Sequence, residues 1–175
     1  MALKGIDETL LGLIACIDSA LVEDDAPTCV TATTVGEPQV ATCCECSGSG
    51  NGELWGNFKR AYPSDPRTGL EVRNRQACVS GMWSAQFQIT LARCFPVIDQ
   101  DGTPEPQDRS DAANSFHADM AAVKSALECC DTIDEKPVVE QITTTLAPTG
   151  GCSYLVVTLH VPVSMSRAHN PRKAA

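Results

Sequence analysis

The sequence predicts an α+β fold in which one mostly antiparallel sheet carries two amphipathic helices on one face. Two observations lead to this prediction. Apolar residues recur at steps of three and four in residues 4–22 and 110–130, which is the period of a helical face. Apolar and polar residues alternate in residues 79–94 and 154–163, which indicates strands with one covered face and one face in water.

Each helix has recognisable ends. The first helix is expected to end at the acidic run before Pro27, because proline disfavours a helical residue before it. Asp108 or Ser110 is the expected N-cap of the second helix. The apolar stripes consist of Ile6, Leu10, Leu13, Ile14, Ile17 and Leu21 in the first helix and of Phe116, Met120, Val123 and Leu127 in the second.

The strands are separated by turn and loop signals. Asn51-Gly52 is a strong hairpin signal, and Gly81 is a natural place for a bulge. In the strand that follows the hairpin signal, we expect Leu54, Phe58 and Tyr62 to share one face. The expected strands are residues 28–35, 40–46, 54–62, 79–94, 138–146 and 154–163.

Length and composition indicate a single globular domain. The chain has 175 residues, of which 43% are hydrophobic and 20% charged, so we expect one α+β domain at residues 1–163 and a flexible basic tail at 164–175. The net charge of −9 argues against a general nucleic-acid binder or an anionic-membrane binder. Acidic residues interrupt the apolar N-terminal stretch, so we expect a soluble protein made without export.

Ten cysteines are the main compositional anomaly. An even number in a short secreted chain would predict a disulfide framework. Because no export pattern is present and several cysteines fall on apolar periodic positions, the leading interpretation is reduced thiols that pack as small hydrophobes. Two alternatives stay open, namely some disulfide bonding and a structural zinc ion held by the C-x-x-C pair Cys43 and Cys46, which lacks a second pair.

No motif predicts catalysis, a cofactor or a resident metal. His117, His160 and His169 do not stand in metalloenzyme spacing, and we expect them to be solvated or hydrogen-bonded. The glycine-rich segment 47–52 lacks the Lys-Ser/Thr of a phosphate-binding loop, and Asp99 begins no complete calcium loop. The prediction is therefore a protein that is not an enzyme. A thiol enzyme would require a cysteine of unusual thiolate reactivity.

Basic residues gather in one region of this acidic chain. Five of its thirteen Lys and Arg residues lie within seventeen positions. The interpretation without a function is a solvated loop. The functional interpretation is contact with an acidic patch on another copy or a partner. Contact with nucleic acid is the third alternative. The candidate partner-contact residues are Lys59, Arg60, Arg67, Arg73 and Arg75.

The order of helix, hairpin, long strand, helix and two final strands resembles the tail terminator proteins of long-tailed bacteriophages, also called neck or head-to-tail connector proteins. The similarity spans residues 5–163 and is greatest to connectors of phages that infect actinobacteria. It is carried by Cys43-Cys44-Glu45-Cys46, Gly50-Asn51-Gly52-Glu53-Leu54-Trp55, Arg60-Ala61-Tyr62-Pro63 and Gly150-Gly151-Cys152.

The resemblance implies a structural virion protein that is assembled in the host cytoplasm. Such subunits form a homo-oligomeric, hexameric ring that caps the tail tube and joins it to the head-side connector or stopper protein. Genomic DNA would pass through the lumen without sequence-specific binding, and no cofactor or membrane is implied. The alternatives are another neck or minor tail component, such as a stopper, and a small zinc-stabilised binding module.

Overall fold

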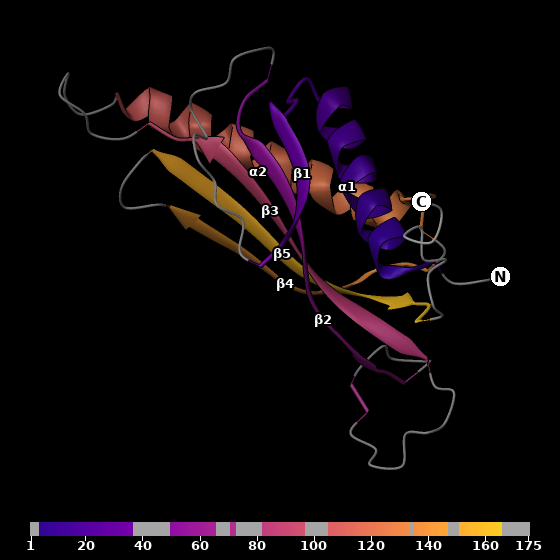
Figure 1. Cartoon of the computed structure of the whole chain (residues 1–175). Helices are drawn as coiled ribbons and strands as arrows, with labels where there is room; N and C mark the ends of the chain where they lie inside the picture. Colours follow the sequence, from indigo (N-terminus) through magenta and orange to yellow (C-terminus); the bar gives the residue numbers. More distant parts are fainter. Residues whose placement is uncertain are drawn as a thin grey trace, which may run out of the picture.

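In the part of the chain that the structure describes, a five-stranded sheet and two helices make up the fold (Figure 1). The computed structural model describes residues 4–36, 50–65, 71–72, 82–96, 105–133, 135–146 and 151–165. The elements in chain order are α1 (Ile6–Glu23), β1 (Val30–Val35), β2 (Glu53–Pro63), β3 (Trp83–Cys94), α2 (Pro106–Cys129), β4 (Val138–Leu146) and β5 (Cys152–Val163).

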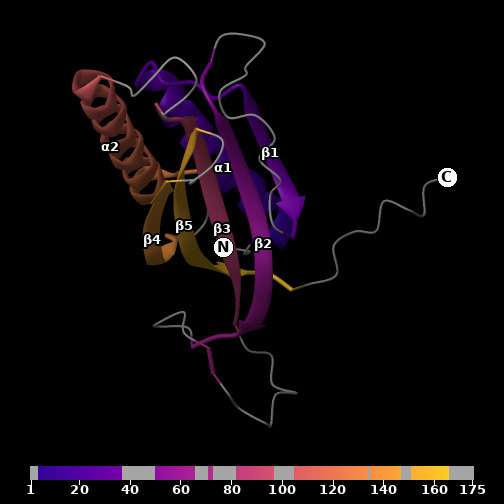
Figure 2. The ribbon, with the colours of Figure 1, turned by 90° about the vertical axis from the view of Figure 1, so that its left-hand side faces the viewer.

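The strand order across the sheet is β1-β2-β3-β5-β4. β1 runs parallel to β2, and the other three neighbouring pairs are antiparallel. The predicted α+β fold with a mostly antiparallel sheet is therefore confirmed. Figure 2 shows the sheet in front of α1, with β1 and β4 at its two edges.

Most predicted elements are present, but their ends differ from the prediction. α2 begins at Pro106, four residues before the predicted start, and Glu105 is the N-cap in place of Asp108 or Ser110. Proline is well suited to this first helical position because its missing N–H would have no intrahelical partner there. The predicted strand at 40–46, the bulge at Gly81 and residues 166–175 of the predicted tail lie outside the described residues.

A bulge in β2 overturns one predicted side-chain face. Phe58 pairs with Phe87, whereas Arg60 pairs with Gln86, so Lys59 is the extra residue between them. Because an inserted residue reverses the alternation that follows it, Tyr62 lies opposite Ser84 on the face away from the helices, not beside Leu54 and Phe58 as expected.

The hydrophobic core lies between the helices and one face of the sheet. On α1 the buried residues match the predicted stripe from Leu10 to Leu21. Gly56 of β2 lets this helix approach closely, because a Cβ on Gly56 would lie 2.7 Å from Cγ1 of Ile14. The sheet contributes Leu54, Ala85, Phe87, Ile89, Leu91, Leu155, Val157, Leu159, Val161 and Val163. Within the described residues neither helix is both long and apolar enough to cross a bilayer.

A buried ion pair fixes α2 to the rest of the domain. The carboxylate of Asp119 on α2 accepts hydrogen bonds from Nε of Arg93 at 2.8 Å and from Nη2 at 2.9 Å. The remaining guanidinium hydrogens go to the backbone oxygens of Ala26, Pro27 and Asn51. A guanidinium has five N–H donors, and all of them are used here. Arg93 therefore joins α2 to the segment after α1 and to the turn before β2.

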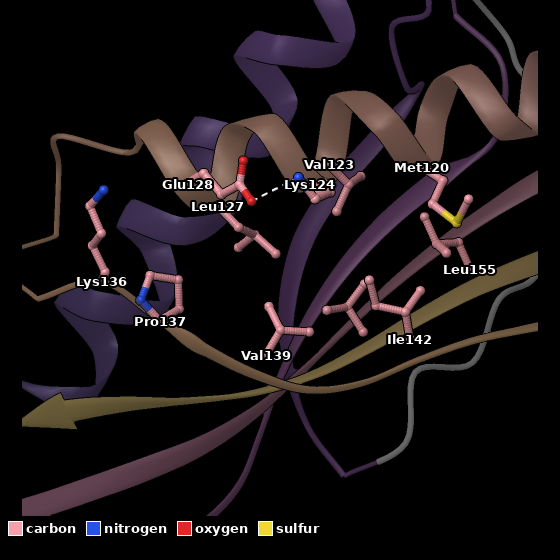
Figure 3. A pocket seen from close by; sticks show the side chains of 11 residues that line it. Met120, Val123, Lys124, Leu127, Glu128, Lys136, Pro137, Val139, Ile142 and Leu155 are labelled. Atoms are coloured by element: carbon pink, nitrogen blue, oxygen red, sulfur yellow. Dashed lines mark ion pairs between the residues drawn. The ribbon is translucent and has the colours of Figure 1, made fainter. Parts of the chain in front are cut away.

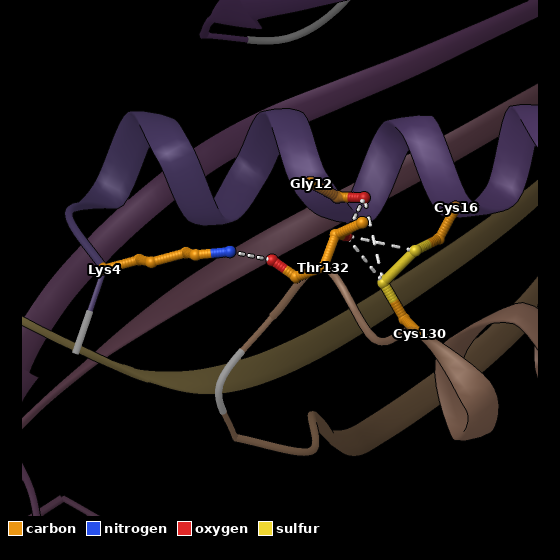
Figure 4. Close-up of a disulfide and its surroundings, with 5 residues drawn as sticks. All are labelled: Lys4, Gly12, Cys16, Cys130 and Thr132. Carbon is orange, nitrogen blue, oxygen red and sulfur yellow. Dashed lines mark hydrogen bonds between the residues drawn. A yellow bond between two sulfur atoms is a disulfide. The ribbon is translucent and has the colours of Figure 1, made fainter. Parts of the chain in front are cut away.

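A disulfide links α1 to the residue that follows the end of α2 (Figure 4). Cys16 of α1 is bonded to Cys130, and their Cα atoms are 5.8 Å apart. Thr132 lies beside the bond. Its hydroxyl donates to the carbonyl oxygen of Gly12 at 3.1 Å, and its carbonyl oxygen accepts a hydrogen bond from Nζ of Lys4.

The expectation of reduced packing thiols is wrong. Cys29, Cys94 and Cys152 are disulfide-bonded as well, and of the described cysteines Cys129 alone is a free thiol. The physical reason is visible at Cys16. Its side chain lies beside the buried stripe of α1, on the side that faces α2, where it meets a cysteine 114 positions away.

We expect the substitution Asp119→Ala to lower the free energy of unfolding by about 3–5 kcal/mol, because it leaves the buried Arg93 charge without its partner. Urea denaturation followed by circular dichroism measures this change. Asp131→Ala is the matched control, since Asp131 is exposed, and should shift stability by no more than about 0.5 kcal/mol. Equal effects of the two substitutions would contradict a structural role for the ion pair.

The double substitution Cys16→Ser/Cys130→Ser should lower the free energy of unfolding by about 2–5 kcal/mol, because the bond closes a long loop in the unfolded chain. Urea denaturation under non-reducing conditions measures the loss. Cys129→Ser removes an exposed free thiol and should have little effect. If the double variant were as stable as wild type, the Cys16–Cys130 bond would not hold the helices together.

Candidate assembly interface

The basic cluster predicted from the sequence is only partly described. Lys59 is exposed at the bulge of β2. Arg60 forms an ion pair with Glu71 at 3.1 Å, donates to Gln86 at 3.0 Å and lies over the Tyr62 ring. Its guanidinium therefore has three neighbours within its own chain.

The remaining members of the cluster, Arg67, Arg73 and Arg75, lie outside the described residues. Contact between the five basic residues and a partner stays a prediction.

A row of polar side chains crosses the sheet face that points away from the helices. The hydroxyl of Tyr62 is 2.5 Å from Nδ1 of His160, and Nε2 of His160 is 2.9 Å from the carboxylate of Glu140. An ionised carboxylate only accepts hydrogen bonds, so Nε2 donates to Glu140, while Nδ1 is hydrogen-bonded to the Tyr62 hydroxyl. His160 is thus the hydrogen-bonded histidine that the sequence predicts, and both its ring nitrogens are engaged.

This row fastens the edge strand β4 to the sheet. Glu140 is the extra residue at the bulge of β4, between Val139 and Gln141. Gln86 of β3 donates to its carboxylate at 2.8 Å. The hydrogen bonds from Gln86 and His160 hold the pKa of Glu140 below its usual range, whereas burial raises the pKa of Tyr62.

The described residues contain no metal-binding cluster: no group of three or more His, Cys, Asp or Glu side chains is arranged to hold an ion. Cys43 and Cys46, the candidates for a structural zinc site, lie outside the described residues. That site therefore stays a prediction.

β4 is an edge strand of the sheet, and no other described strand pairs with its outer side. Every described side chain from Val138 to Thr145 is exposed. Glu140, the one charged residue of the strand, is tied back to His160 and Gln86. Folded proteins usually protect an edge strand with charges, proline or a covering segment. The residues after the bulge of β4 carry no charge, so they present the kind of edge to which another strand adds.

An apolar groove lies between β4 and α2 (Figure 3). Its volume is about 240 Å³, and its walls are Val139 and Ile142 of β4 and Met120, Val123 and Leu127 of α2. Val139 and Ile142 are 41% and 40% exposed. Large apolar side chains that remain accessible in a concave site are typical of a surface that binds a partner.

The charged residues that line the groove are two lysines and one glutamate. Lys136 lies next to Pro137 (Figure 3). Lys124 also lines the groove, but it is paired with Glu128 at 2.8 Å. Lys136 is therefore the lysine of the groove to which the described residues assign no acidic partner.

Sequence analysis did not identify this groove. Its one signal was the pattern of residues 138–146, where Val139 and Ile142 are three positions apart and so break the alternation of a regular strand. The bulge at Glu140 is the cause, because the inserted residue brings both side chains to the helix-covered face.

We expect Gln86→Leu to raise the pKa of Glu140 towards its usual range, because the hydrogen bond from Gln86 is the largest cause of the lowered pKa. Carboxyl ¹³C NMR titration measures the pKa of Glu140. The charged form is favoured by the fold, so the contact is present at neutral pH and is lost as the pH falls through the lowered pKa. Gln88→Leu, two residues along β3, is the control and should leave the Glu140 titration unchanged.

The sequence matches no model of a protein family, and none of the curated proteins is significantly similar to it.

Proposed function

We propose that the chain is a structural subunit that assembles with copies of itself into a ring, as a tail terminator of a long-tailed bacteriophage. In this role the ring caps the tail tube, contacts the tail tube protein and the head-side connector, and lets genomic DNA pass through its lumen. The observation that carries the proposal is that β1 and β4 are the two edges of the sheet, with no further described strand beside either, and that they lie at the same level along the strand direction.

The pairing register shows that β1 and β4 lie at the same level along the strand direction. From Val30 of β1, the pairs run through Glu53, Ala92 and Tyr154 to Thr145 of β4. From Val35 of β1, the pairs run through Phe58, Phe87 and Leu159 to Val139. β1 therefore spans the same part of the sheet as β4 does between Val139 and Thr145.

The strand directions also allow the two edges to pair. β1 is parallel to β2, and three antiparallel steps lead from β2 to β4, so β1 and β4 run in opposite directions. A second copy that extends the sheet beyond β4 with its own β1 thus makes an antiparallel pair. β1 has the sequence VTATTV, which contains no charge that would oppose such pairing.

A contact between two different edges is heterologous, so its repetition gives either a closed ring or an open filament. The resemblance to tail terminators favours the closed hexamer. The disulfide-bonded cysteines also fit the proposed location, because disulfides persist on virion surfaces, outside the reducing cytosol.

We expect the purified chain to form rings with a central channel, alone or together with tail tube protein, when it is imaged by negative-stain electron microscopy. A proline substitution in the edge strand β4 should abolish the rings. N–H groups along an edge strand point alternately to its own sheet and outwards, so one of Thr143→Pro and Thr144→Pro removes an outward donor and leaves the monomer intact.

Circular dichroism and thermal unfolding identify which of the two proline variants stays folded. The folded variant is the informative one, and the expected result is a monomer without rings. Rings of normal size from that variant would show that β4 does not pair between copies.

A further inference from the structure

The exposed apolar side chains of the domain gather at its two edges. Of the eight large hydrophobic residues that are exposed in the described chain, six lie on β4 or on the β1 side. The two most exposed are Leu11, at 57%, and Val22, at 54%, both on α1. The set on β4 is Val138, Val139 and Ile142, and the set at the other edge is Leu11, Val22 and Val30.

The exposed apolar residues of α1 form a stripe on the side of the helix towards β1. Leu11, Ala15 and Val22 are exposed and share one side of the helix with Asp18, at spacings of four, three and four. The carboxylate of Asp18 accepts hydrogen bonds from the hydroxyls of Thr31 at 2.7 Å and Thr28 at 3.2 Å. We call Leu11, Ala15 and Val22 the α1 stripe. It lies beside β1, at the far edge of the sheet from the groove.

The opposite side of α1 faces α2. Cys16 is bonded to Cys130, and the carbonyl oxygen of Gly12 accepts a hydrogen bond from Thr132. The α1 stripe therefore points away from α2 of its own chain. It has no apolar cover within the described residues, because its side chains are exposed.

The α1 stripe and the groove lie on the same face of the sheet and at the same height. Ile142 of the groove pairs with Val157, and the row continues through Ile89 to Gly56. Gly56 lies directly under α1, since a Cβ there would be 2.9 Å from Cδ1 of Leu10. Leu11 follows Leu10 on the helix and therefore lies at the same level along the strand direction as Ile142.

Charge complementarity selects a second copy of α1 as the occupant of the groove. From Ile6 to Glu23 the helix contains acidic residues and no basic one, and its first turn carries Asp7 and Glu8. The groove presents Lys136, two residues before the start of β4. A second groove would offer Lys136 no such complement, because Glu128, the acidic residue that lines it, is already paired with Lys124.

We propose that the groove between α2 and β4 receives the α1 stripe of a second copy of this chain, whose β1 lies antiparallel to β4. Leu11 of the incoming helix packs on Ile142, and Asp7 lies beside Lys136. This inference rests on the proposed function and names the side-chain contact that accompanies strand pairing. Both helices of the junction are held by their own chains, so the two surfaces meet preformed.

The test uses one variant on each side of the contact. Leu11→Glu places a charge in the α1 stripe, and Ile142→Glu places one in the groove; both sites are exposed in the monomer. At concentrations at which the wild type assembles, each variant alone should remain monomeric in size-exclusion chromatography with light scattering. Asn114→Glu, at an exposed site of α2 that does not line the groove, is the control and should assemble like wild type.

Mixing the two variants gives the decisive result. A heterologous contact leaves one intact α1 stripe on the Ile142→Glu chain and one intact groove on the Leu11→Glu chain, so the mixture should form dimers and nothing larger. A contact between identical surfaces predicts no recovery. Circular dichroism of each variant shows that it is folded.

Exchanging the charges of Asp7 and Lys136 tests the proposed contact between these two residues. Asp7→Lys and Lys136→Glu should each raise the dissociation constant of assembly about tenfold, and the double variant should restore it, because every junction then contains the reversed pair. If the double variant were weaker than either single variant, Asp7 and Lys136 would not be neighbours.

The outcomes separate this inference from the proposed function. If both glutamate variants form rings like wild type while the folded proline variant does not, the strands pair but the α1 stripe does not enter the groove. If the wild type stays monomeric at about 1 mM, alone and with tail tube protein, the association is weaker than a millimolar dissociation constant and both proposals fail.

Discussion

The buried guanidinium of Arg93 holds together three parts of the chain. Asp119 of α2 takes two of its hydrogens, and the backbone oxygens that follow α1 and precede β2 take the rest. A buried charge without such partners would strongly destabilise the fold. The requirement that every donor be satisfied therefore fixes where α2 lies. That position, in turn, sets the shape of the groove between α2 and β4.

Two contacts anchor α2, and another part of its surface lines the groove. Arg93 holds the helix at Asp119, and the disulfide from Cys16 holds the chain just after it, at Cys130. Arg93 belongs to β3 and Cys16 to α1. On the β4 side, Val123 and Leu127 are buried in the core and Met120 is partly buried, and all three line the groove (Figure 3). A partner that enters the groove would meet a surface that is already ordered, which reduces the entropy lost on binding.

The two ends of β4 differ in the contacts that they make. At its beginning, the bulge at Glu140 is fastened to His160 and Gln86, and a bulge discourages regular pairing. Beyond the bulge the strand is uncharged and exposed on both faces. The same polar row holds the strand to its own sheet, and no other described strand pairs with its outer side. This combination fits a protein whose sheet is extended by a neighbour.

The periods of helix and strand are local properties of the backbone, so the sequence by itself determined the two helices, the alternating strands and the buried stripe of α1. It also determined that His160 lies on the polar face of the last strand. Only the tertiary structure decided which of ten cysteines meets Cys16, that Arg93 pairs with Asp119, and that β1 and β4 are the edges of the sheet. The bulges at Lys59 and Glu140, which moved Tyr62 to the other face and Ile142 into the groove, belong to this second group as well. The reason is physical: each of these features depends on how segments far apart in the chain pack together, and no short stretch of sequence contains both partners.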